Sequence, residues 1–335
     1  MPPQMTLPRQ PSRRRFLQSS GAILAAPAGP RFAWAQNYPT KPVRIVVGFP
    51  PGGLTDVVAR LIGQSLSDRL GQQFVVENRS GAATNLATGE VIRAAADGYT
   101  LLMATATNAI NATVYEKLNF NFICDIAPIV GIIDAALVME VNPSFPAKTV
   151  PEFIAYAKSN PGKINYASAG IGSPNHVAGE LFKMMAGVDM VHVAYRGSTA
   201  GALTNLMQGQ VQVLFDPVLS SLEYIRAGTL RALAVTTARP SQALPGIPTI
   251  GDFLPGFAVS AWHGLVAPKG TPPDIIDALN RQVAAALAEP GLRARFAALG
   301  TTVLAPNSPA DFGKLIADDT EKWAKVVKFA GIKGD

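Results

Sequence analysis

The feature that most limits the fold is a unit that recurs from residue 43 onward. Each copy has a short β-branched run, a turn rich in glycine, serine or threonine, and a segment with helical spacing of apolar residues. The first copy consists of Val43–Val47, Gly48–Gly53 and a helical segment, Leu54–Leu70, which ends at Gly71. Because each helix returns the chain to the start of the next strand, the alternation predicts an α/β fold of parallel strands covered by helices.

The same spacing gives an expected order of elements for the rest of the chain. Further strands are predicted at residues 74–76, 99–103, 164–166, 191–193, 211–215 and 231–236. Further helices are predicted at residues 84–96, 150–160, 174–185, 198–208, 275–287, 292–299 and 312–327.

The length of the chain favours two domains, because roughly 300 residues exceed a comfortable single core. Two apolar, strand-like stretches, residues 135–141 and 257–266, are the expected crossings between them. The first domain would then comprise residues 36–140 and 259–335, with residues 141–258 inserted as the second. Two short crossings form a hinge that lets rigid domains close around a ligand.

The first 35 residues have the pattern of a removable export signal. Ser12–Leu17 contains paired arginines, Gly21–Ala26 is a short apolar stretch, and Ala33–Ala35 has the small residues of a cleavage site. This order predicts export by the twin-arginine route, cleavage after Ala35 and a periplasmic product. The alternative is an arginine-rich tail that binds nucleic acid.

Composition argues against nucleic acid as a partner. The precursor has a formal net charge of +6, and residues 1–35 hold five arginines and no acidic residue, so removal of the signal leaves +1. No basic stripe or zinc-ligand spacing remains for a phosphate backbone. The single cysteine, Cys124, allows no intrachain disulfide and is expected to be a buried apolar residue. After the signal, no apolar run reaches the 18 or more residues of a membrane helix, which predicts a soluble protein.

Two turns between a strand and a helix are candidate anion sites. Phe49–Asp56 and Ser168–Ser173 place glycines and hydroxyl groups where backbone N–H groups at a helix start attract an anion. Neither turn has the spacing of a dinucleotide loop or a P-loop, so a carboxylate is the expected ligand, although such glycines also serve local packing alone. In an open α/β sheet, these turns meet at the carboxyl ends of the strands.

A hydrolase is the alternative that Ser173, His176 and Asp216 suggest. The sharp G-x-S-x-G elbow is absent, and a histidine three residues along the same helix start is poorly placed to act as a base for Ser173. The other histidines, His192 and His263, lie in apolar strands, which favours packing. Three histidines without zinc-ligand spacing predict no metal site, and no cofactor motif is present.

Together these segments resemble a known family, the Bug-type (TctC-type) extracytoplasmic solute receptors of tripartite tricarboxylate transporters. The segments that carry the resemblance are Tyr38–Val47, Pro51–Asp56, Val76–Arg79, Asp97–Leu102, Tyr166–Ser173 with His176, His192–Gly197, Leu233–Thr236 and Leu265–Pro272. Two turns depart from the family pattern. Ser80–Thr84 stands where the family usually has Pro-Gly-Ala-Gly-Gly, and Pro50 stands where it usually has alanine.

The resemblance implies a two-lobed periplasmic-binding-protein fold of the type II class, with the ligand carboxylate held by residues 51–56 and 168–173. It also implies delivery of the ligand to a membrane-embedded transporter pair. The expected ligand-binding residues are Phe49, Gly53, Leu54, Asp56, Ser80, Thr105, Ser168, Ala169, Gly172, Ser173, His176, Tyr195 and Asp216.

We therefore expect a monomeric periplasmic receptor that captures a small mono- or dicarboxylate without catalysis, metal or cofactor. A receptor that docks on a sensor kinase is the alternative that the sequence leaves open.

Overall fold

The computed structural model describes residues 38–334, except residues 116 and 196–198. The predicted export signal and its cleavage site lie outside these residues. From residue 38 on, the described chain forms one compact unit.

The first part of the chain alternates strands and helices as expected. Its elements are β1 (Val43–Val47), α1 (Leu54–Leu70), β2 (Phe74–Asn78), the short 3₁₀ helix η2 (Ala82–Thr84), α2 (Asn85–Ile92), β3 (Thr100–Thr105) and α3 (Ala106–Val114). They are followed by β4 (Ile126–Val141), the longest strand.

The middle of the chain repeats this order. Its elements are α4 (Val150–Ser159), β5 (Asn165–Ser168), α5 (Pro174–Ala186), β6 (Val191–Ala194), α6 (Ala200–Met207), β7 (Val213–Pro217), α7 (Val218–Arg226), β8 (Arg231–Val235) and the 3₁₀ helix η3 (Ile250–Asp252). The last part has β9 (Ser260–Pro268), α8 (Pro273–Leu287), α9 (Pro290–Ala298), β10 (Thr301–Val303) and α10 (Pro309–Ala330).

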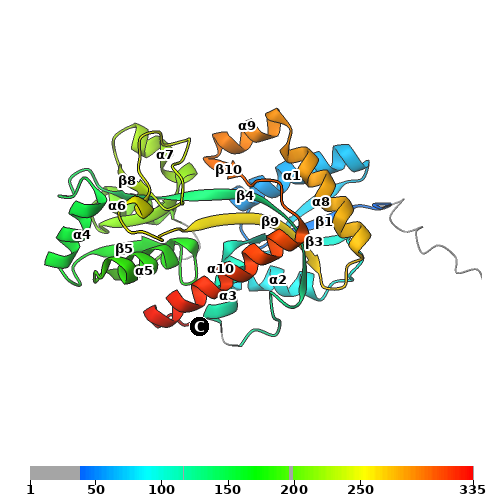
Figure 1. Cartoon of the computed structure of the whole chain (residues 1–335), viewed down its shortest axis with the longest axis horizontal. Coiled ribbons are helices and arrows are strands. Elements are labelled where there is room, and N and C mark those ends of the chain that lie inside the picture. The colour runs from blue at the N-terminus through cyan, green and yellow to red at the C-terminus, as the bar shows by residue number, and fades with distance from the viewer. Residues whose placement is uncertain (1–37, 116, 196–198, 335) are drawn as a thin grey trace, which may run out of the picture. The chain divides into compact units, whose positions relative to one another are not determined.

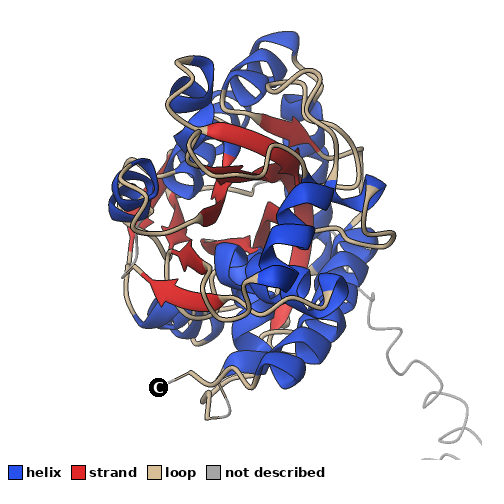
Figure 2. Cartoon of the chain, turned by 90° about the vertical axis from the view of Figure 1, so that its left-hand side faces the viewer, coloured by secondary structure: helices blue, strands red, loops and turns tan. Residues whose placement is uncertain are grey.

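The strands join in the order β2-β1-β3-β9-β4-β7-β5-β6, with β8 and β10 also paired to β4. Strand β4 changes partners along its length. Up to Ala136 it pairs with β9, and its last residues, Leu137–Val141, pair with β7. In Figure 1, β4 and β9 run between the group that contains β1, β3 and α1 and the group that contains β5, α4 and α5. Figure 2 shows helices packed around the strands.

Buried apolar side chains form one core on each side of the point where β4 exchanges β9 for β7 as its partner. Strand β1 and helix α1 bury residues such as Ile45 and Ile62 in one cluster, while β5 and α5 bury Tyr166 and Phe182 in another. Helix α10 contributes to the packing of both groups, because Phe312 near its start packs with Trp262 and β3, whereas Trp323 packs in the cluster of β5 and α5. The parallel pairs β1–β2, β1–β3, β5–β6 and β5–β7 confirm the predicted α/β alternation.

Several elements differ from the sequence prediction. The helix expected over residues 84–96 covers only Asn85–Ile92, because the chain turns at Ala94 and Gly98 has a φ of 81°. Helices α3 and α7, strand β10 and the first part of β4 were not predicted. Strands β4, β8, β9 and β10 pair antiparallel, so the sheet is mixed.

The prediction of a buried Cys124 is wrong, since this thiol is exposed. It lies in a turn where Cys124 N–H donates to Asn121 O, 3.1 Å away. Phe122 takes the buried position of this turn and is only 1% exposed, which leaves Cys124 on the outside.

Candidate functional site

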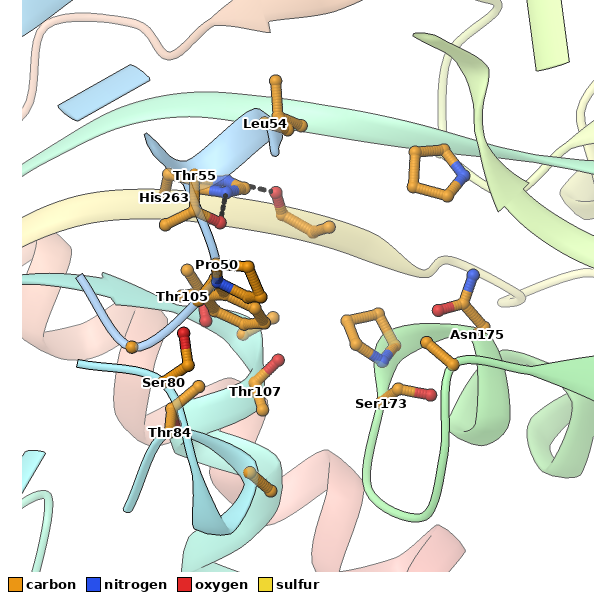
Figure 3. A pocket seen from close by; sticks show the side chains of 18 of the residues that line it. Pro50, Leu54, Thr55, Ser80, Thr84, Thr105, Thr107, Ser173, Asn175 and His263 are labelled. Carbon is orange, nitrogen blue, oxygen red and sulfur yellow. Dashed lines mark hydrogen bonds between the residues drawn. The ribbon is translucent and has the colours of Figure 1, made fainter. Parts of the chain in front are cut away.

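A cavity of about 360 Å³ lies at the carboxyl ends of the parallel strands. Figure 3 shows Ser173 and Asn175 on one side of it and Ser80, Thr105 and Thr107 on the other. Its lining residues come from the turns that follow β1, β2, β3, β5 and β7, and from β4 and β9. They are Gly48, Phe49, Pro50, Leu54, Thr55, Ser80, Gly81, Ala83, Thr84, Thr105, Ala106, Thr107, Leu137, Ala169, Ile171, Ser173, Pro174, Asn175, Pro217, Ala261 and His263.

Five helices begin at this cavity. Leu54 is the first residue of α1, while the residues that precede α2, α3, α5 and α7 are Thr84, Thr105, Ser173 and Pro217. All five line the cavity. Since each helix start carries a partial positive charge, the five together favour an anion in the space between them.

Backbone donors at three of these helix starts are available to a ligand. Within the described part of the chain, the cavity-lining residues whose helix-start N–H groups have no hydrogen-bond acceptor include Leu54, Thr55, Ala106, Thr107 and Asn175. The first N–H groups of a helix have no partner within the helix, so a bound oxygen atom can satisfy them.

Among the described residues, the cavity wall has no Lys, Arg, Asp or Glu side chain. Its one titratable side chain is His263, whose pKa burial lowers to about 4, so the ring is neutral at pH 7. Ala261 O can only accept, and it lies 3.0 Å from His263 Nδ1, which therefore carries the hydrogen. His263 Nε2 then accepts from the Thr55 hydroxyl at 3.0 Å. A carboxylate here would be bound by neutral donors.

Asp56 holds the loop that precedes α1. Its Oδ2 accepts from Gly52 N–H at 2.9 Å and from Arg60 Nε at 3.0 Å, and its Oδ1 accepts from Asn78 Nδ2 at 3.0 Å. Burial alone would raise the pKa of Asp56, but these hydrogen bonds from Arg60, Gly52 and Asn78 lower it below its ordinary value. Asp56 thus fixes the loop that carries Phe49 and Leu54 while its own charge is satisfied within the protein.

The expected ligand-binding residues divide into two groups in the structure. Those that line the cavity are Phe49, Leu54, Ser80, Thr105, Ala169 and Ser173. Those outside the lining are Gly53, Asp56, Ser168, Gly172, His176, Tyr195 and Asp216. Gly53 caps α1, and Gly172 N–H donates to His176 Nδ1 at 3.2 Å, so these two shape the loops that do line it.

The remaining three are engaged elsewhere. Ser168 Oγ lies 2.6 Å from His192 Nε2, and Tyr195 Oη accepts from Asn205 Nδ2 at 2.5 Å. Asp216 is fully buried in β7, behind the cavity residue Asn175, whose Nδ2 lies 3.5 Å from Asp216 Oδ1. Whether these residues touch a ligand stays a prediction.

The geometry around Ser173 gives it no histidine base. Its Oγ donates to Gly170 O at 2.7 Å and accepts from the backbone N–H of His176 at 3.3 Å. The His176 ring is occupied by Gly172 N–H and stacks on His192 with ring centroids 3.9 Å apart. Ser173 is thus the cap of α5.

Sequence reasoning missed cavity residues at several helix starts and on β9. Thr107 lies four residues after the strand predicted at 99–103, and Asn175 lies in the first turn of the helix predicted at 174–185, so their hydroxyl and amide groups were a usable signal. His263 and Ala261 gave no such signal, because they lie within β9 and reach the cavity only through its pairing, His263 with Thr105 of β3 and Ala261 with Ala135 of β4.

Comparison with known proteins places the chain in a family. The sequence model of the TctC family, described as "Tripartite tricarboxylate transporter family receptor", matches residues 58–332. The chain belongs to this family. Over 323 residues, the receptor is 36% identical to protein BugT of Bordetella pertussis, a match that covers 95% of this chain and 96% of BugT.

Two solved structures carry a named ligand. R. palustris Rpa4515 with adipate has a TM-score of 0.79 and 36% identity, over 88% of this receptor and 99% of that chain. MatC (Rpa3494) from Rhodopseudomonas palustris with bound malate has a TM-score of 0.76 and 32% identity, over 87% of this receptor and 100% of that chain. The receptor has the α/β fold of two-lobed periplasmic binding proteins, which confirms the predicted fold class. None of its described helices is both long and apolar enough to span a bilayer.

Proposed function

We propose that this receptor captures a small mono- or dicarboxylate in the cavity and delivers it to a membrane transporter of the tripartite tricarboxylate type. The observation that carries the proposal is the meeting of five helix starts at one cavity whose described wall has no charged side chain. Free N–H groups at the starts of α1, α3 and α5 supply hydrogen-bond donors for carboxylate oxygens. The ligand therefore needs no charged side chain in the wall to bind it.

The shape and polarity of the cavity support a small acid with an aliphatic body. Hydroxyl groups of Thr107 and Ser173 lie on opposite sides of the space, and Leu137 and Ile171 are among the apolar residues that line it. A dicarboxylate could place one carboxylate at each side, and a monocarboxylate could use one side only. The ligands named for the two solved relatives, adipate and malate, are acids of this kind.

We further propose that capture occurs in the periplasm by a monomer whose two domains close around the ligand. The domain boundaries are those expected from the sequence, residues 36–140 with 259–335 and residues 141–258. The change of partners on β4 after Ala136, opposite Ser260 at the start of β9, supports a hinge near these boundaries. Export by the twin-arginine route with cleavage after Ala35 remains part of this proposal.

Thermal unfolding with a panel of acids tests the carboxylate proposal. The purified protein is first unfolded and refolded to remove any retained ligand, and then mixed with adipate, malate, succinate or butyrate. An acid at about 100 times its Kd stabilises the folded state by roughly 2.7 kcal/mol and raises Tm by several degrees. The proposal would be contradicted if no acid changed the Tm while a solute of another class raised it.

A pair of glutamate variants locates the binding site. Thr107→Glu puts a negative charge at the start of α3 inside the cavity and should abolish the shift, because it repels a carboxylate. Ala310→Glu is the matched control, since it puts the same charge in the first turn of α10 at an exposed position. An equal acid-induced shift in both variants would place the ligand elsewhere.

A further inference from the structure

The turn that leads into α2 has an unusual backbone. Ala82, Ala83 and Thr84 have φ values of 46°, 49° and 77°, and they are the only described residues other than glycine with a positive φ. A side chain with a Cβ disfavours this left-handed region, and a β-branched residue such as Thr84 disfavours it most. A strained backbone persists where its surroundings fix it, and such strain gathers at binding sites.

Two asparagines of α3 hold the turn. Asn111 Nδ2 donates to Ala83 O, which can only accept, so the amide orientation is fixed. Asn108 Oδ1 accepts from Thr105 N–H at 2.8 Å, so its Nδ2 faces the turn and donates to Thr84 Oγ1 at 3.2 Å. Both asparagines are at least 95% buried, which makes these bonds costly to break.

The side chain of Thr84 is fixed by this arrangement. Its Cβ lies 2.7 Å from the point where a Cβ on residue 48 would lie, so Gly48 is the residue that leaves room for it. Its Oγ1 accepts from Asn108 Nδ2, while Asn111 Nδ2 lies 3.5 Å away and has nearer acceptors in Ala83 O and Asn85 Oδ1. Among the described residues, the Thr84 hydroxyl hydrogen has no acceptor, and Thr84 lines the cavity.

We propose that Thr84 is a ligand-binding residue of the receptor, whose hydroxyl donates a hydrogen bond to an acceptor oxygen of the bound acid. Thr84 Oγ1 accepts from Asn108 Nδ2 and has no acceptor for its own hydrogen among the described residues, so that hydrogen is left to point at the ligand. The left-handed turn is what brings this β-branched side chain to the wall. The inference rests on the proposed carboxylate function and names one side-chain donor to the bound acid.

Two variants of Thr84 separate the contribution of the hydroxyl group to affinity from that of the methyl group. Thr84→Val keeps the shape and removes the donor, whereas Thr84→Ser keeps the donor and removes the methyl group. Affinity for the same four acids is measured by calorimetry on refolded full-length protein. We expect Thr84→Val to weaken every acid that the wild-type protein binds by about tenfold or more, because a hydrogen bond to a charged group is lost. Thr84→Ser should stay within about threefold of the wild type.

Thr113→Val is the matched control, since the Thr113 hydroxyl bonds Ile110 O of its own helix and does not line the cavity. Equal affinities of the wild type and Thr84→Val for an acid would overturn the inference and leave the carboxylate function intact. The same holds if Thr84→Ser loses as much affinity as Thr84→Val, since the methyl group would then be responsible. A wild-type protein that binds none of the acids overturns the proposed function, and the inference with it.

Discussion

Single residues behind the cavity show how charge is kept away from the ligand. Ser221 Oγ lies 2.7 Å from Glu140 Oε1 and 3.3 Å from Asp216 Oδ2, and all three residues are fully buried. Burial raises the pKa of Asp216 to about 7 and that of Glu140 well above its ordinary value. One hydroxyl hydrogen cannot serve two carboxylates, so one of the two acids carries a proton and donates to Ser221. The wall beside Asn175 is therefore less negative than its sequence indicates.

The raised pKa of Asp216 predicts a pH-dependent stability that Asp216→Asn removes. The unfolded chain releases this proton near pH 4, whereas the folded protein keeps it up to about pH 7. Stability from this group is therefore complete at low pH and lost as the pH rises from 4 to 7, at about 1.4 kcal/mol per pH unit. Asp216→Asn should match the wild type near pH 4 and exceed it at pH 8, measured by urea unfolding. A stability difference that is the same at every pH would contradict this assignment.

At the scale of elements, the turn Gly81–Thr84 and the start of α2 form the least regular segment of the cavity wall. Ala83 and Thr84 are not glycines, and both residues nevertheless have a glycine-like φ. Hydrogen bonds from the two asparagines of α3 hold this backbone conformation. The strain therefore comes from the packing of η2 against α3.

Ala83→Gly should stabilise the ligand-free receptor. Glycine relieves a left-handed strain of about 1–2 kcal/mol but loses more chain entropy on folding, so we expect a net gain of about 1 kcal/mol in the free energy of unfolding. The check is chemical denaturation without ligand. Ala324→Gly, at an exposed interior position of α10, is the control and should lose about 1 kcal/mol. Destabilisation by Ala83→Gly as large as that of the control would show that Ala83 is not strained.

At the scale of the whole molecule, the loop after β5 lies against α3. Gly172 has a φ of 74°, and a Cβ there would lie 3.3 Å from Asn111 Oδ1, a buried atom with no hydrogen-bond partner among the described residues. Gly172 belongs to the turn that leads into α5, while Asn111 is on α3, which follows β3. In the closure that we propose, the two groups of elements would meet at this contact.

A pair of alanine variants tests whether this contact limits closure. Gly172→Ala and Gly187→Ala both place a side chain at a left-handed φ, but the Cβ of residue 187 would meet no atom within 4 Å. Both should lose about 1 kcal/mol of stability. Only Gly172→Ala should also lose the decrease in radius of gyration on binding an acid, measured by small-angle X-ray scattering. If the radius of gyration of both variants decreased equally on binding an acid, the contact between Gly172 and Asn111 would not limit closure.

The sequence by itself determined the class of fold and the places where a ligand could bind. Strand and helix periods are local properties, so β1, α1, β5 and α5 follow from them, as do the caps Gly71 and Thr149. Because carboxyl ends of parallel strands share one edge, residues such as Leu54 and Ser173 were recognisable before their neighbours were known.

Only the tertiary structure decided which of these residues face the cavity and in what state. Asp216 and Ser168 lie at strand ends, yet pairing and packing bury them behind the wall, whereas His263 and Ala261 reach it through the register of β9 against β3 and β4. The left-handed φ of Thr84 depends on two asparagines more than 20 residues away. Contacts between distant segments set side-chain direction, burial and charge state, so local periodicity specifies the elements while their packing specifies the site.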